Sequence, residues 1–81
     1  MTNITEIIEK IDPLLSKDVE LALLALLTIS IREQTCLTRQ IKEFGFTDIP
    51  AEIPLLVDNL TDLDYLEICC HISQGLLNDA N

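Results

Sequence analysis

The sequence predicts a small all-α domain, a bundle-like arrangement of four or five antiparallel helices with no sheet. Three observations support this fold class. Apolar residues recur at helical spacing along most of the 81 residues, the chain has only two glycines and three prolines, and no two segments alternate like paired strands. A chain of this length forms one domain, so we expect residues 1–81 to fold as a single helical unit.

The first helix is expected over Ile4–Ile11. The four isoleucines of this range follow the i, i+3, i+4, i+7 spacing of one helical face, and Thr2 or Asn3 is placed to cap the N-terminus. The helix ends at Asp12 and Pro13, because the residue before a proline avoids the helical conformation. Charged residues within this helix exclude it as the apolar part of a signal peptide.

A long helical segment is expected from Lys17 to Phe44, with Ser16 before it. As one helix it would be about 40 Å long, whereas a compact domain of this size is roughly 30 Å across. Two alternatives follow. The helix bends near Ser30, where Ser30 and Glu33 fit a capping box, or it stays continuous, projects and pairs with another chain. Thr28–Arg32 also alternates like a strand, but the chain offers no second strand to pair with it.

Two further helices are expected after Gly45, which is placed to end the long segment. A short helix begins near Pro50 and runs to about Asn59, with Pro54 in its first turn, where proline is tolerated. The last helix begins after Thr61, which is a good N-cap residue, and aspartates in its first turn suit the helix dipole.

The predicted core consists of apolar residues that share helical faces. On the last helix, Leu63, Leu66, Cys70 and Leu77 lie on one stripe. A second apolar stripe lies beside it and consists of Tyr65, Cys69, Ile72 and Leu76. The residues predicted for the core are Ile7, Ile11, Leu23, Leu26, Leu27, Leu37, Ile41, Leu56, Leu60, Leu66, Cys70 and Leu77.

Charge is distributed unevenly along the chain. The sequence has 14 acidic and five basic residues, a formal net charge of −9. All five basic residues lie within residues 1–44, and residues 45–81 hold seven acidic residues and no base. Such a surface repels phosphate and anionic lipid, so we expect no direct nucleic-acid binding and no membrane binding. No apolar stretch is long enough to span a bilayer. The favoured partner is a protein with a basic surface.

The three cysteines, Cys36, Cys69 and Cys70, do not suggest a disulfide framework, because their number is odd and two are adjacent on a helix. They indicate a reducing compartment, the cytoplasm. Cys69, Cys70 and His71 point in three directions on a helix and cannot converge on one zinc ion. An i, i+4 pair between Glu67 and His71 is the expected contact. No catalytic or phosphate-binding motif occurs, so we expect no enzyme, no cofactor and no metal.

The leading functional hypothesis is a protein-binding effector without catalysis, such as an inhibitor, an immunity protein, an antitoxin-like factor, an adaptor or a phage anti-defence protein. In the extreme case it imitates a nucleic acid. Asp58, Asp62, Asp64 and Glu67 cluster around the start of the last helix and are the predicted partner-binding residues.

The alternative is a homo-oligomerisation or scaffold module. Apolar residues make up 48% of the chain and its mean hydropathy is +0.31, more than one small core should cover. The Leu-rich stretch Val19–Ile31 would form the seam of a homodimer, with residues 18–44 supplying much of the contact. Leu24 and Ile31 share one helical face and are the predicted dimer-interface residues.

Overall fold

The computed structural model describes residues 3–80, and these residues form five α-helices, one 3-10 turn and no strand. The elements are α1 (Ile4–Ile11), η1 (Asp12–Leu14), α2 (Lys17–Glu33), α3 (Leu37–Phe44), α4 (Glu52–Val57) and α5 (Asp62–Ala80). The predicted all-α class is confirmed.

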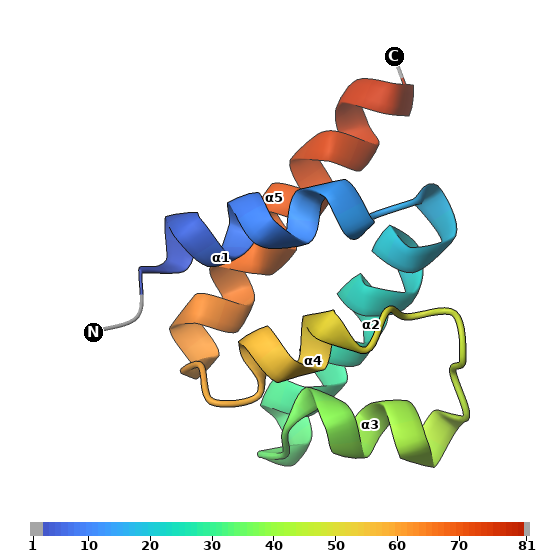
Figure 1. Cartoon of the computed structure of the whole chain (residues 1–81), viewed down its shortest axis with the longest axis vertical. Helices are drawn as coiled ribbons and strands as arrows, with labels where there is room; N and C mark the ends of the chain where they lie inside the picture. The colour runs from blue at the N-terminus through green and yellow to red at the C-terminus, as the bar shows by residue number, and fades with distance from the viewer. Residues whose placement is uncertain (1–2, 81) are drawn as a thin grey trace.

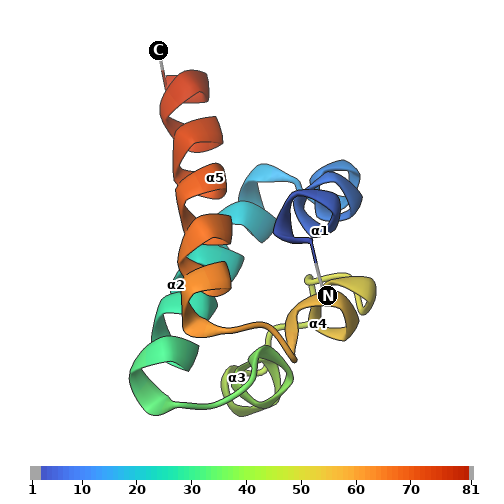
Figure 2. The same ribbon diagram turned by 90° about the vertical axis from the view of Figure 1, so that its left-hand side faces the viewer.

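The helices form two layers. In one layer α2 and α5 pack against each other and run in opposite directions (Figure 1). The other layer consists of α1, α4 and α3, which lie on one side of that pair (Figure 2). The last turns of α5 extend beyond the other helices, toward the C-terminus. The core therefore lies between the α2–α5 pair and the three shorter helices.

The first helix has the predicted bounds. The Asn3 side chain caps it by accepting a hydrogen bond from the Thr5 amide at 3.0 Å, whereas the other predicted cap, Thr2, lies outside the described residues. Ile7 and Ile11 are buried. The chain then turns through η1, which contains Pro13.

The long segment breaks into α2 and α3, which are bent by 113° relative to each other. Gln34 ends α2 in the left-handed conformation, with φ of 57°, and the Thr35 amide donates to the Ser30 carbonyl at 3.0 Å. Ser30 is buried inside α2, and its hydroxyl donates to the Leu26 carbonyl at 2.8 Å. The predicted capping box at Ser30 and Glu33 is therefore wrong, and so is the alternative of one continuous helix.

No single helix within residues 3–80 is both long and apolar enough to cross a membrane. The combination of α2 and α3 reaches the required length and hydropathy, but only as a sharply bent pair.

The last helix begins directly after Thr61, as the sequence predicts, whereas α4 covers Glu52–Val57 and is about two residues shorter at each end than expected. Gly45 ends α3 with φ of 71°, and its amide donates to the Ile41 carbonyl at 2.9 Å. Pro54 lies in the first turn of α4, where its missing N–H removes no helical bond. Thr61 and Asp64 form a capping box at the start of α5. The Asp64 amide donates to Thr61 Oγ1 at 3.2 Å, and the Thr61 amide donates to the Asp64 carboxylate at 3.4 Å.

The core confirms the predictions for α1, α2 and the start of α3, and corrects them for α5. Six predicted residues are buried: Ile7, Ile11, Leu23, Leu26, Leu27 and Leu37. Three more are partly buried and pack against these: Ile41, Leu56 and Leu60. The prediction for Leu66, Cys70 and Leu77 is wrong, because all three are exposed.

The buried face of α5 consists instead of Tyr65, Ile68, Cys69 and Ile72. This face carries no charged residue through the body of the helix. The predicted face has Glu67 on its flank, one helical turn after Leu63, and burying that face would also remove a carboxylate from water. The helix is therefore turned toward its uncharged face.

Candidate functional site

The four acidic residues predicted to bind a partner lie in different environments. Asp62 and Glu67 are exposed. Asp64 is half-buried and belongs to the capping box of α5. Asp58 is half-buried and accepts two hydrogen bonds from Thr38, one from its amide at 3.0 Å and one from its hydroxyl. Only Asp62 and Glu67 therefore present carboxylates that are both exposed and free of these internal bonds.

Asp58 has a structural role at the start of α3. Cys36 occupies the N-cap position of that helix and forms no side-chain capping bond. Asp58, which follows α4, supplies the missing acceptor, and its negative charge suits the positive end of the α3 dipole. Thr38 lies 20 residues earlier in the chain, so local patterns carry no signal for this contact.

The exposed side of α5 carries a row of apolar side chains, here named the α5 apolar stripe and defined as Leu63, Leu66, Cys70 and Leu77, with the polar Ser73 and Gln74 between its last two members. The exposed fractions of the three leucines are 66%, 50% and 58%, and Cys70 is exposed as well. Large apolar side chains at this spacing are usually buried, and a row of them in water marks an interaction surface more often than a solvent face. The stripe is therefore the main candidate binding feature.

A shallow depression of about 540 Å³ lies along the C-terminal part of the stripe. Its lining is mostly apolar and consists of Leu66, Cys69, Cys70, Ser73, Gln74 and Leu77. The depression is open to solvent on one side of α5, so it suits a side chain of a partner better than an enclosed small molecule.

The two adjacent cysteines of α5 differ in environment. Cys69 is buried on the core face, and burial raises the pKa of its thiol. Cys70 points about 100° away from Cys69 around the helix and is exposed within the stripe. Cys36, before α3, is exposed too, and all three thiols are free.

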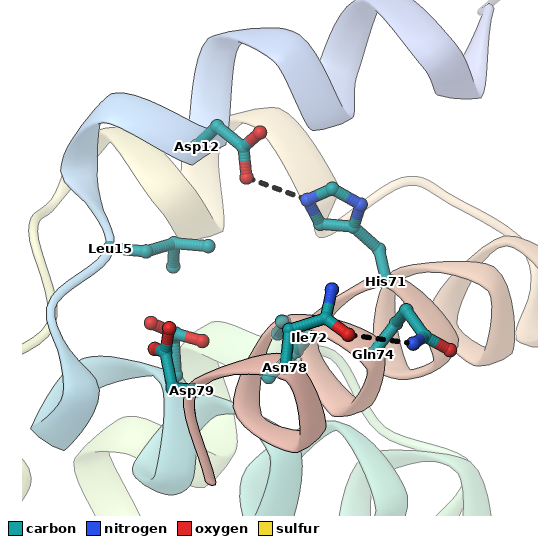
Figure 3. Close-up of a pocket in the computed structure, with 9 residues that line it drawn as sticks. Asp12, Leu15, His71, Ile72, Gln74, Asn78 and Asp79 are labelled. Carbon is teal, nitrogen blue, oxygen red and sulfur yellow. Dashed lines mark hydrogen bonds and ion pairs between the residues drawn. The ribbon is translucent and has the colours of Figure 1, made fainter. Parts of the chain in front are cut away.

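A polar pocket of about 400 Å³ lies between η1, the start of α2 and the last turns of α5 (Figure 3). His71 Nε2 lies 2.6 Å from Asp12 Oδ1 across it. The expected pairing of His71 with Glu67 is wrong, because the imidazole reaches η1 instead. Glu20 and Asp79 also line the pocket. Both partners of the His71–Asp12 contact are substantially exposed, so this contact contributes little to stability.

The predicted dimer-interface residues lie on α2. Leu24 and Ile31 are half-buried and pack against the core. Leu21, on the same helix, is more exposed than Leu24 or Ile31, with half of its surface in water. Contact of Leu24 and Ile31 with a second copy stays a prediction.

Within residues 3–80, no three His, Cys, Asp or Glu side chains are placed to hold a metal ion together. Comparison with protein-family models finds no match for this chain, and comparisons with curated proteins and with solved structures find none either.

Proposed function

We propose that this chain is a non-catalytic protein-binding effector that docks on a basic surface of another protein. Inhibitors, immunity proteins, antitoxin-like factors, adaptors and anti-defence proteins act in this way. The observation that carries the proposal is the acidic charge of residues 45–80, where five of the seven acidic side chains are exposed and no lysine or arginine occurs.

Two features of the described residues support this proposal. Asp48, Glu52, Asp62, Glu67 and Asp79 are all exposed. The ion pair found within residues 3–80 joins Asp12 to His71, so it neutralises none of them. A chain under selection for solubility alone would intersperse both signs of charge.

The expected behaviour follows from electrostatics. A basic partner is drawn to this half of the molecule over about a Debye length, so association is fast at low salt and slows as salt rises. Charge sets the rate and the choice of partner, whereas burial of apolar surface supplies most of the affinity.

The test compares two charge-matched variants in affinity capture from the native host. One variant combines Asp62→Asn, Glu67→Gln and Asp79→Asn, and the control combines Glu6→Gln and Glu9→Gln with Glu43→Gln. Both lose the same amount of charge at exposed positions. The proposal predicts a basic protein that the wild type and the control retain at low salt and the first variant loses. Retention of the same proteins by all three chains would contradict it.

Homo-oligomerisation is the second candidate function, and one observation favours it. The segment formed by α2 and α3 carries four of the five bases beside four acids, so two copies of this segment can meet without net repulsion. Leu21→Glu tests this candidate better than substitution of Leu24 or Ile31, because Leu21 is the more exposed side chain. A homodimer requires a doubled mass in sedimentation at micromolar concentration, reduced by Leu21→Glu. A monomeric wild type would exclude it.

A further inference from the structure

The α5 apolar stripe has the dimensions of one side of a helix–helix contact. Leu63 and Leu77 are separated by four turns of α5, about 21 Å along its axis. The last turns of α5 extend past the other helices, which leaves this part of the stripe open (Figure 2). A partner element that covers it must be straight and about as long.

Two carboxylates border the stripe on opposite sides. Asp62 lies one turn before Leu66, and Glu67 lies one turn after Leu63, so each is the i, i+4 neighbour of a stripe residue. Both are exposed, and α5 contains no lysine or arginine along its length. The apolar row is therefore framed by negative charge.

We propose that the α5 apolar stripe binds an amphipathic helix of a partner protein, with an apolar face against Leu63, Leu66 and Leu77 and with Lys or Arg on its flanks against Asp62 and Glu67. This inference rests on the proposed function and specifies the partner. Ridges of side chains on two helices interdigitate along such a contact, and an amphipathic helix supplies apolar anchors at i, i+3, i+4 and i+7. The depression beside Cys70 receives one of these anchors.

The framing charges argue against a second copy of this chain as the occupant. Parallel pairing of two α5 helices along their stripes would bring Asp62 and Glu67 of both copies together, with no lysine or arginine on either helix. Like charges at a helical contact repel, and the repulsion is largest where apolar contacts exclude water. A basic helix turns the same charges into attraction.

The test uses three synthetic peptides of about 18 residues, long enough to cover the stripe. The first is an amphipathic Leu/Lys helix. The second has the same composition in scrambled order, so that its leucines share no face. The third is an amphipathic Leu/Glu helix. Binding of each to the full chain is measured by isothermal titration calorimetry at low and high salt.

Variants of the chain locate the binding surface. A double variant that combines Leu66→Ser and Leu77→Ser removes two exposed apolar side chains of the stripe. Leu55→Ser is the matched control, because Leu55 is 80% exposed and lies on α4, outside the stripe. The circular dichroism of each variant verifies folding. We expect the wild type to bind the amphipathic Leu/Lys peptide in preference to both others, and the double variant to weaken this binding by about tenfold or more. Leu55→Ser leaves it unchanged.

Thiol alkylation gives an independent readout, since Cys70 lies in the stripe and Cys36 does not. Both are exposed free thiols. The Leu/Lys peptide should slow the modification of Cys70 by iodoacetamide in proportion to the fraction of chains that have peptide bound. It should leave the rate of modification of Cys36 unchanged. Equal protection of both thiols would overturn the proposed location.

Other outcomes also overturn the inference, and they separate it from the proposed function. Equal binding of the ordered and scrambled Leu/Lys peptides would mean that charge alone recognises the partner, so the proposed function stands and the helical site fails. Failure to bind either basic peptide would count against both. A wild-type dimer that becomes monomeric in the double variant would identify the occupant as a second copy.

Discussion

Replacement of Asp58 by alanine should destabilise the fold, although this residue first suggests a docking surface. The substitution removes the acceptor for the Thr38 amide at the start of α3 and for the Thr38 hydroxyl. Loss of an N-cap costs about 0.5–2 kcal/mol, and loss of a further hydrogen bond about 1 kcal/mol. We expect a total loss of about 1.5–3 kcal/mol, which is large beside the ~4–12 kcal/mol typical of a domain this size.

Urea unfolding followed by far-UV circular dichroism measures this loss as a lower midpoint at unchanged slope. Glu67→Ala is the control, because Glu67 is exposed on α5, and it should change stability by about 0.5 kcal/mol or less. Asp58→Asn should retain most of the stability, since asparagine caps helices well. If Asp58→Ala proves as mild as Glu67→Ala, the capping role is refuted. If its effect simply adds to that of Thr38→Val, the hydroxyl bond contributes nothing, because valine keeps the backbone amide and removes only the hydroxyl.

Three other predictions concern the core, the turns and pH. Ile68→Ala should lower the free energy of unfolding by about 2–5 kcal/mol, because Ile68 is 1% exposed. Leu66→Ala should lower it by about 1 kcal/mol or less, because Leu66 is exposed. Equal losses of stability in urea unfolding would refute the orientation of α5. Gln34→Gly should stabilise the chain by about 0.5–1 kcal/mol, because Gln34 has φ of 57°; a lower melting temperature would contradict this. Burial raises the pKa of Tyr65 above 10.0 and that of Cys69 above 9.0, so folding favours their protonated forms. The stability that these two groups contribute is complete below about pH 9 and declines as the pH rises, so a melting temperature that stays constant up to about pH 11 would be the contrary result.

The sequence was most informative where local signals agree. The Asn3 cap, the isoleucine spacing and Pro13 together define α1, and Thr61 as N-cap with aspartates in the first turn marks the start of α5. These features involve neighbours in the chain, so spacing alone reveals them.

Features that depend on distant contacts were not predictable in this way. Gln34 is a good helix former, yet it breaks the long segment in a conformation that favours glycine, because tertiary packing outweighs local preference. The link from Asp58 to Thr38 joins residues 20 positions apart. The face of α5 was ambiguous since apolar residues cover two adjacent stripes, and the charge of Glu67 beside one of them was the signal that distinguishes the two.

The rate at which Cys69 and Cys70 react with iodoacetamide in the native chain tests the central claim, that α5 exposes its apolar stripe, most directly. These neighbours point about 100° apart on the helix, so they report on its orientation. We expect Cys70 in the native chain to react almost as fast as it does in urea. We expect Cys69 to react at least about tenfold more slowly than Cys70, because Cys69 is buried and the pKa of its thiol is raised. Protection of Cys70 together with fast reaction of Cys69 would contradict the account.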